Sequence, residues 1–426
     1  MSRLLTAHDA HTLVNALVKQ MTGQTNIAAT DASTFISTGE FLLNSGVEKV
    51  FNTMSLVLGQ TRVASRVYKG KFALINAMDT GLYSHRMRKI SFYSKDSEAA
   101  GNFNTDAFTN FADGFTAGEN ETGTPPVAQS TKSQWEQCYK HPFEVSFGGS
   151  DVWQYGITRL EDDIKAAFRD EASFNSFING MLVEVANDIE SEREAFNRMI
   201  INSEIVKRYY LETQGITSGC AVNLTAAFNA YYSTTYTTAD LLSTYLKEFN
   251  AFLVVKIREI SDRMTERGTA FHDPFTKTIN GVSQSILRHT PYDKQRIMLY
   301  APVLRYAEAT VLPEIFRPGY LDLEKQFERV DYWQSNYNDT ARSEINMTSA
   351  YLDHVTGEQT ATTAVDLKMV IGCIFDEDAV LSDMQLSSAR TTNVEARKGI
   401  INTWYNFAKN SIGDQSENFV VLYMAD

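Results

Sequence analysis

The sequence has few of the residues and motifs that mark several large classes of protein. Its 426 residues include three cysteines, Cys138, Cys220 and Cys373, which are scattered and odd in number. This usage argues against a disulfide framework and suits a reducing compartment; Cys373 lies in an apolar run and is expected to be a core thiol. No apolar run reaches the roughly 18 residues that a membrane-spanning helix requires. The opening residues, MSRLLTAHDAH, lack the apolar segment and cleavage site of a secretory signal.

Basic residues are also in short supply. The formal net charge at pH 7 is −13, and no basic run is longer than RMRK at residues 86–89. A sequence-specific reader of nucleic acid normally carries a basic patch, whereas an acidic surface keeps a protein soluble and repels polyanions. Because 43% of the residues are hydrophobic, the sequence predicts an acidic protein with a sizeable core.

Motifs of common enzyme classes are absent. The sequence contains no P-loop, Gly-x-Gly-x-x-Gly turn, His-Glu-x-x-His helix, Gly-x-Ser-x-Gly elbow or Cys-x-x-Cys pair. His8, Asp9 and His11 lie within one helical turn, but a metal site needs more ligands. The acidic runs at 161–163 and 376–378 could hold a divalent cation, and a solvated turn or helix start explains them better. We therefore expect no catalytic residue, no metal site and no cofactor.

One stretch predicts an unusually long helix, from about residue 170 to 213. Its apolar residues recur with a mean step of about 3.6, which is typical of a straight amphipathic helix, about 55 Å long over residues 174–210. The apolar positions are Phe174, Ile178, Met181, Val185, Ile189, Phe196, Ile200, Val206 and Tyr210. Those from Phe174 to Ile200 are expected to form the buried core of the helix. Asp170 or Ser173 can cap its start and Gly215 can end it, while Glu192 falls at a gap in the apolar stripe.

The N-terminal part of the chain predicts a helical arm and then strands that leave and return. TAHDAHTLVNALVKQMTG reads as a short helix and QTNIAATDAS as a polar linker. RVYKGKFALINAM and YSHRMRKISFYSKDS are strand-like, and HPFEVSFGGSDVWQYGITR returns as two strands. The long loop between them is rich in small, polar and phenyl residues. Without interleaved basic residues, its phenylalanines are expected to pack against protein rather than stack on nucleic acid.

The C-terminal half predicts a compact mixture of helices and strands. A second long helix is expected from about 238 to 265, and PVLRYAEATVLPEIF predicts another. QRIMLYA and DLKMVIGCIFD have the pattern of buried strands. The closing residues, KGIINTWYNFAKNSIGDQSENFVVLYM, read as two strands around a turn at Gly413 and Asp414.

The order of these parts resembles the major capsid protein of tailed double-stranded DNA phages, whose fold is shared with herpesvirus shells. The likeness is greatest to short-tailed phages. It rests on SFNSFINGML at the start of the long helix, VKRYY at its end, and a final segment of MVIGCIFDEDAVLSDMQ, INTWYNFAK and FVVLYM. The resemblance covers residues from about 34 to 426. The resemblance lies in the order and the residue composition of successive segments, and it includes no single diagnostic motif.

The resemblance implies an α+β fold with a peripheral domain, an axial domain, an extended β-hairpin loop and an N-terminal arm. The arm is residues 1–33, for which the family offers no matching motif. The peripheral domain comprises residues 34–66, 159–215 and 366–426, with the long helix as its spine. The extended loop is residues 67–158 and the axial domain residues 216–365. Contacts with a neighbouring subunit are expected at Arg86, Arg88, Phe103, Phe108, Phe111 and Phe143.

The implied function is structural. The chain would self-assemble into hexamers and pentamers of an icosahedral capsid, in the virion, after assembly in the cytoplasm of a bacterial host. The implied partners are copies of itself, a portal protein, scaffolding or accessory capsid proteins, and non-specifically contacted double-stranded DNA, with no membrane and no cofactor. Two alternatives remain at this stage: an encapsulin-type compartment shell, and a cytosolic enzyme without a familiar motif.

Overall fold

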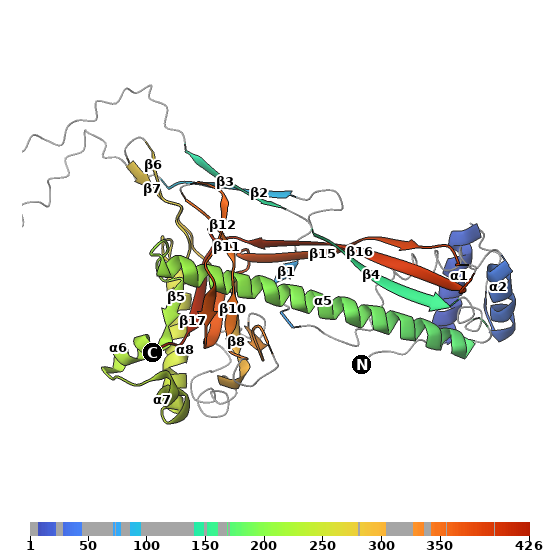
Figure 1. Cartoon of the computed structure of the whole chain (residues 1–426), viewed down its shortest axis with the longest axis horizontal. Helices are drawn as coiled ribbons and strands as arrows, with labels where there is room; N and C mark the ends of the chain where they lie inside the picture. Colours follow the sequence, from blue (N-terminus) through green and yellow to red (C-terminus); the bar gives the residue numbers. More distant parts are fainter. Residues whose placement is uncertain are drawn as a thin grey trace, which may run out of the picture.

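The computed structural model shows an elongated α+β molecule. It describes residues 7–22, 29–44, 71–72, 74–77, 86–94, 140–148, 151–160, 168, 171–279, 282–303, 327–335, 342–354, 356–395 and 397–426. Within these residues, one long helix, α5 (Glu171–Thr213), runs along the molecule, with a sheet and three helices at one end, called the head here, and two helices at the other (Figure 1). Among the described residues, no helix combines the length and apolarity needed to cross a membrane.

The predicted long helix is present as α5, which has 43 residues. Its end follows from the backbone of Gly215, whose φ of +71° is favourable for a residue without a side chain. The amide of Gly215 donates to the carbonyl of Glu212 at 3.0 Å, and that of Ile216 donates to Leu211 at 3.0 Å. These hydrogen bonds satisfy carbonyls that would otherwise lack partners in the last turn.

The head contains a five-stranded sheet in the order β5-β17-β14-β8-β9. The strands are β5 (Ala221–Asn223), β8 (Gln295–Tyr300), β9 (Phe327–Val330), β14 (Val370–Asp376) and β17 (Phe419–Tyr423). Every residue of β14 is buried, as the apolar run predicted. Three α-helices, α6 (Leu224–Tyr232), α7 (Thr238–Ser243) and α8 (Leu246–Met264), share one apolar core with this sheet. A short 3-10 helix, η3 (Tyr292–Lys294), precedes β8.

The predicted second long helix is divided into α7 and α8. Thr237 and Asp240 form a capping box that starts α7. Tyr245 then leaves helical geometry, with φ −107° and ψ 26°, and its ring stacks on that of Tyr236 at 4.1 Å between centroids. The prediction of one continuous helix was wrong because the apolar spacing continues through a break that local backbone and ring contacts create.

A four-stranded sheet, in the order β1-β15-β16-β4, extends beside α5 (Figure 1). Its strands are β1 (Asn76–Ala77), β4 (Asp151–Leu160), β15 (Val380–Thr391) and β16 (Ile400–Gly413). Ile157, Tyr405 and Phe407 form an apolar cluster on this sheet, against which Ile189 of α5 packs. The single apolar stripe of the helix is therefore used against a sheet, as its pattern predicted.

The final two strands do not form the expected hairpin. β16 pairs with β15 and β4, whereas β17 pairs with β14 and β5. The residues between them, 414–418, cross from one sheet to the other and are buried. The sequence predicted a turn at Gly413 and Asp414 between two strands, whereas residues 414–418 form a buried connection between two sheets.

Two strands form a separate ribbon beyond the four-stranded sheet. β2 (Arg86–Phe92) pairs with β3 (Pro142–Gly148) in antiparallel register, and β3 leads into β4. The strands YSHRMRKISFYSKDS and HPFEVSFGGSDVWQYGITR are thus confirmed, while of RVYKGKFALINAM the described part contains only the two residues of β1 as strand. Three further two-stranded ribbons border the head: β6 (Lys277–Ile279) with β7 (Val282–Gln284), β10 (Ile345–Met347) with β13 (Val365–Leu367), and β11 (Ala350–Leu352) with β12 (Gln359–Ala361).

The N-terminal part contains two helices, α1 (Ala7–Thr22), which was predicted, and α2 (Ala32–Asn44), which was not. Asp31 caps α2, because its carboxylate accepts from the amide of Thr34 at 2.8 Å. The ring of Phe35 on α2 meets Phe174 of α5 at 5.4 Å between centroids, and Phe168 meets Phe174 at 5.2 Å. The two helices thus pack at the beginning of α5, where they surround the first apolar residue of its stripe.

The sheets do not follow the expected border between residues 365 and 366. β14 and β17 were assigned to the peripheral domain, but they pair with β8 and β5, which lie in the segment assigned to the axial domain. A strand that is apolar on both faces needs neighbours on both edges and cover on both sides. The end of the chain therefore contributes the middle of the sheet in the head.

Candidate functional site: a charged junction in the head

The crossing from β16 to β17 is a run of buried polar residues in the head. Asp414, Ser416 and Asn418 are each at most 2% exposed, although Asp, Ser and Asn seldom lie in a core. Buried polar groups cost free energy unless they are hydrogen-bonded. We call residues 413–418, with the side chains that bind them, the junction.

The long helix supplies one side of the junction. Lys207 donates to the carbonyl of Gly413 at 2.8 Å, and Arg208 donates to the carbonyls of Gln415, at 2.8 Å, and Asp414. Glu204, one turn earlier, pairs with both cations. A Cβ atom on Gly413 would lie 1.6 Å from Oε1 of Glu204, so a larger residue there would displace the carboxylate that pairs with Lys207 and Arg208.

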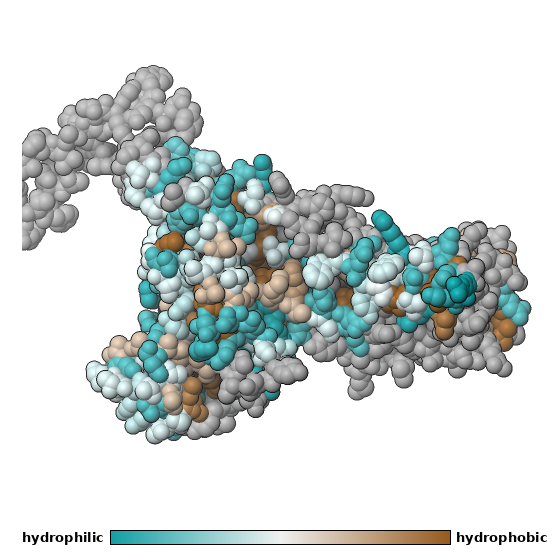
Figure 2. Space-filling model, viewed as in Figure 1, coloured by the Kyte–Doolittle hydropathy of each residue, from teal (hydrophilic) through white to brown (hydrophobic). Residues whose placement is uncertain are grey.

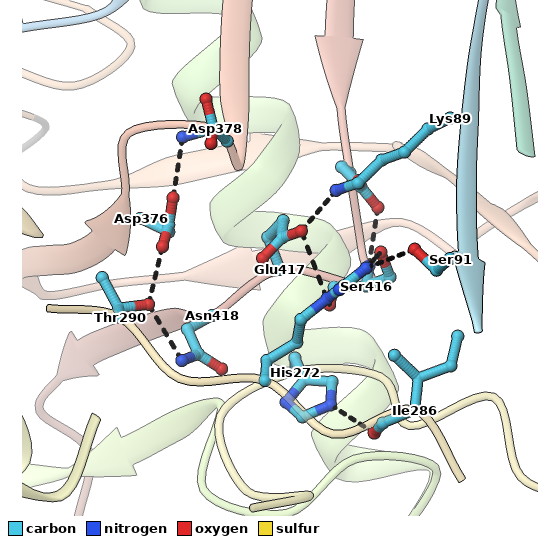
Figure 3. Close-up of polar contacts among 12 residues, drawn as sticks. Lys89, Ser91, His272, Ile286, Thr290, Asp376, Asp378, Ser416, Glu417 and Asn418 are labelled. Atoms are coloured by element: carbon cyan, nitrogen blue, oxygen red, sulfur yellow. Dashed lines mark hydrogen bonds and ion pairs between the residues drawn. The ribbon is translucent and has the colours of Figure 1, made fainter. Parts of the chain in front are cut away.

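The β2–β3 ribbon supplies another side. Lys89 on β2 forms ion pairs with Asp414 and Glu417, and Figure 3 shows its side chain reaching toward Glu417. Nε of Arg288 lies 3.2 Å from Oε1 of Glu417, while its Nη2 donates to Oγ of Ser91, also on β2, at 2.6 Å. Two carboxylates and two cations thus join the ribbon to the crossing.

Burial and the neighbouring positive charges shift the pKa values of the two carboxyl groups, Asp414 and Glu417, in opposite directions. Burial raises the pKa of Glu417, and Lys89 and Arg288 only partly offset that effect. Burial also raises the pKa of Asp414, but Lys89 together with hydrogen bonds from Ser416 outweighs it, so the pKa of Asp414 is below its usual range. Asp414 is therefore the firmly ionised member, and Glu417 is the one held less strongly in its charged form.

The loop before β6 supplies the third side. Asp273 is fully buried and accepts from the amide of Phe275 at 3.0 Å and from the side-chain amide of Gln415 at 2.7 Å. His354 binds the same carboxylate at 2.6 Å, and that hydrogen bond raises the pKa of His354. His354 thereby ties the end of the β11–β12 ribbon to the junction.

His272 is a core residue rather than a general base. Its two ring nitrogens lie 3.0 Å from the carbonyl oxygens of Ala270 and Ile286, and Figure 3 shows the contact with Ile286. Burial lowers the pKa of His272 and outweighs the two carbonyl contacts. A neutral imidazole donates through only one nitrogen, so the ring hydrogen-bonds one of these two carbonyls at a time.

The acidic run at 376–378 is a structured turn. Asp376 accepts from Oγ1 of Thr290 at 2.7 Å and from the amide of Asp378 at 2.9 Å, and Asn418 donates to Thr290 at 3.0 Å (Figure 3). Within the described ranges, no group of three or more His, Cys, Asp or Glu side chains is placed to hold a metal ion. Cys373 is buried and burial raises its pKa, which agrees with the core thiol predicted from the sequence.

The predicted apolar stripe of the long helix is buried at both of its ends. Phe174 and Ile200 are at most 4% exposed, and Ile189 and Phe196 pack partly buried against apolar clusters. Ile178, Met181 and Val185 lie in α5, but their side chains fall outside what the structure describes. Glu192 is exposed, as its gap in the stripe predicted, and it forms an ion pair with Lys409 of β16.

Of the residues predicted to contact a neighbouring subunit, one is exposed, one packs within its own chain, and the others lack a described side chain. Arg88 is exposed on the ribbon and lies 3.0 Å from Glu144 of β3. Phe143 packs within the same chain, at 4.6 Å between its ring centroid and that of Phe275. Arg86 is in β2 without a described side chain, and Phe103, Phe108 and Phe111 lie outside the described residues. Their contacts in an assembly stay a prediction.

Sequence reasoning missed Lys89, Asp414 and Glu417. RMRK was treated as one basic run, although alternate residues of a strand point to opposite faces. That alternation separates Arg88, which is exposed, from Lys89, which is half-buried. The partners of Lys89 lie 325 and 328 residues away along the chain, so no local pattern could identify them.

Neither a protein-family model nor a curated protein sequence matches the chain. Similar solved structures exist. A chain in the capsid structure of Staphylococcus phage Andhra has 10% identity and a TM-score of 0.49, with 84% of each chain covered. A chain in the structure of the head fiber and inner core protein gp22 of native bacteriophage P68 has 9% identity and a TM-score of 0.46, covering 82% of this chain and 83% of that one.

A third similar chain, from the capsid structure of the cyanophage P-SCSP1u, has 11% identity and a TM-score of 0.41, covering 82% of this chain and 86% of that one. All three come from phages.

Proposed function

We propose that this chain is a major capsid protein of a tailed phage, which assembles as hexamers and pentamers into an icosahedral shell around double-stranded DNA. The observation that carries the proposal is the shape of the subunit. A 43-residue helix is backed by a sheet along its side, and a β-ribbon extends from that sheet (Figure 1). This arrangement makes a stiff, elongated subunit with several separate surfaces, which suits a wall better than a catalytic cleft.

Exposed apolar side chains at distant places on the molecule support assembly through several contacts. On the ribbon, Ile90 is 60% and Phe92 is 56% exposed; on the head, Tyr231 is 68% and Val255 is 53% exposed. Figure 2 shows apolar patches separated by hydrophilic surface on the face in view. Contacts between different patches of identical chains generate rings and shells, and many such contacts together give a stable particle.

The roles of the segments follow from this proposal. Residues 34–66, 159–215 and part of 366–426 form the peripheral wall, with α5 as its spine. Residues 67–158 form the extended loop that lies over a neighbouring subunit, and residues 216–365, joined by β14 and β17, form the axial domain. Portal, scaffolding or accessory capsid proteins would be further partners, and the virion would be the location.

The junction supports a structural role. Its charged groups are each engaged with a backbone carbonyl, a counter-charge or a hydrogen-bond partner that belongs to the fold. A catalytic set would place an acid, a base or a nucleophile toward a space that a substrate can enter. We therefore infer that the chain is not an enzyme.

Assembly of the purified full-length chain tests the proposal. Sedimentation should show particles in the megadalton range, or capsomers that convert to shells, and negative-stain electron microscopy should show closed shells. A monodisperse small oligomer under all assembly conditions, including with the phage's own scaffolding protein, would refute the proposal. A shell that carries a foreign protein cargo and no DNA would instead favour an encapsulin-type compartment.

A further inference from the structure

The β2–β3 ribbon has two unlike faces. Its two strands pair with each other in one register from Arg86 with Gly148 to Phe92 with Pro142. Ile90 and Phe92 point away from the head and are more than half exposed, whereas Ser91 and Tyr93 are buried. The inward face is therefore what holds the ribbon on the head.

That inward face has an apolar attachment at one end. Tyr93, Phe275 and Ile286 form a small cluster with Phe143, and the amide of Ser94 donates to the carbonyl of Ser285 at 2.9 Å. These contacts lie where the strands lead to the segment between residues 94 and 140. They fix this end of the ribbon; at the other end β3 stops at Gly148 and the chain enters β4 at Asp151, which pairs with Lys409 of β16.

The second attachment lies in the middle of β2, where Ser91 accepts a hydrogen bond from Arg288 at 2.6 Å and Lys89 forms the ion pairs with Asp414 and Glu417. The side chain of Lys89 is 28% exposed, but those of Asp414 and Glu417 are 2% and 11% exposed. Solvent and salt thus reach the lysine more easily than the carboxylates. An ion pair at such a boundary is weaker and more sensitive to salt than one in the core.

The carboxylates keep other partners if Lys89 leaves. Glu417 retains Arg288 at 3.2 Å, and Asp414 retains the amide of Ser416 at 2.8 Å. Arg288 also binds the carbonyl of Ser416 at 3.1 Å, which holds the crossing in place from the head. Other charged groups around the junction belong to the helix and the head, namely Glu204, Lys207, Arg208, Asp273 and His354.

We propose that Lys89 is a releasable ionic anchor, which holds the middle of the β2–β3 ribbon against the head; when it is released, the part of the ribbon between the apolar end and β4 lifts while the junction stays closed. The ribbon then has two positions, and the charge of Lys89 sets the balance between them. This inference does not depend on the proposed assembly, because every contact in it lies within one chain.

Thiol labelling at residue 91 tests the anchor. Ser91 is 6% exposed and lies between Lys89 and the apolar end, so a cysteine there reacts only when the ribbon lifts. The change to cysteine removes the hydroxyl that accepts from Arg288, equally in every variant compared. The full-length chain carries Ser91→Cys, with Cys138→Ser to remove a competing thiol. Lys89→Met and the control Arg88→Met are added separately; Arg88 is the adjacent cation but pairs with Glu144 inside the ribbon. Cys220 and Cys373, both fully buried, report opening of the whole fold.

Lys89→Met should raise the labelling rate of the thiol introduced at position 91 by about tenfold or more, which corresponds to about 1.4 kcal/mol, while Arg88→Met changes it little. Labelling of Cys220 and Cys373 should stay slow in both variants. Raising the ionic strength from about 0.1 M to about 1 M shortens the screening length from about 10 Å to about 3 Å. That change should speed labelling when Lys89 is present and have little effect in the Lys89→Met variant. Equal rates in the two variants, or parallel acceleration at all three thiols, would overturn the proposal.

Discussion

Arg208→Met should be among the most destabilising single changes in the long helix. The side chain of Arg208 is fully buried, donates to the carbonyls of Asp414 and Gln415, and pairs with Glu204. Methionine keeps much of the volume but removes the charged donor from both carbonyls and the counter-charge from Glu204. The two carbonyls then keep only backbone donors, the amide of Asp273 at 2.8 Å for Gln415 and the amide of Glu417 at 3.3 Å for Asp414. Hydrogen bonds to charged groups contribute about 1.5–3 kcal/mol each, and breaking a buried ion pair costs about 3–5 kcal/mol.

These contributions overlap, so we expect the free energy of unfolding to fall by about 4 kcal/mol. That is a large part of the total of about 5–15 kcal/mol typical for a folded protein. Urea unfolding of the unassembled chain, followed by circular dichroism, measures the change. Arg193→Met is the matched control, because Arg193 lies on the same helix, is 40% exposed and pairs with Glu190 only at 3.8 Å. A difference of less than about 1 kcal/mol between the two variants would contradict the role assigned to the junction.

The remaining predictions concern packing, the extended loop and DNA. Gly413→Ala should destabilise the chain in the same urea assay, because the added carbon overlaps a carboxylate of α5. Ile189→Asp, which places a charge against the sheet, should cost about 3 kcal/mol; Glu192→Gln should cost about 1 kcal/mol, because it deprives the buried Lys409 of its ion pair, and equal melts would contradict this order. Replacing residues 95–135 by a short Gly-Ser linker should leave a folded chain that does not form shells in electron microscopy, and normal shell yield would refute the loop assignment. Subunits should bind duplex DNA poorly in anisotropy at about 0.15 M salt, since the net charge is −13, and sub-micromolar affinity with a steep salt dependence would revive a nucleic-acid-binding role.

Periodicity predicted the parts of the fold that depend on one buried face. The apolar stripe from Phe174 to Ile200 located α5, and alternation at Phe143 and Phe147 located β3. In both cases a local repeat reports directly on burial. The helix α2 was missed because Asp31 and Thr34, which cap it, lie within a run of polar residues that also fits a linker.

Pairing between strands far apart in sequence could not be predicted in the same way. The sequence located the strand Phe419–Tyr423 but not the strands that it pairs with. Those partners, β14 and β5, depend on which strands are buried on both faces, and the polar residues before Phe419 do not indicate that the chain passes to another sheet. The junction was missed for a related reason, because its contacts also join residues far apart in sequence. Charged residues normally lie at the surface, so a sequence pattern assigns Glu204, Lys207 and Arg208 to a solvated helix face, whereas all three are buried.

The long helix therefore contacts the rest of the protein in two different ways along its length. Its first part presents an apolar stripe, with Ile189 against the four-stranded sheet, and two polar contacts join it to the same sheet: Glu192 pairs with Lys409 and Tyr155 donates to Asp188. Its last turns present Lys207 and Arg208 to specific carbonyls of the crossing, and hydrogen bonds from a guanidinium allow only one register. The helix is therefore held on the sheet by apolar packing together with an ion pair, and on the head by hydrogen bonds of fixed direction.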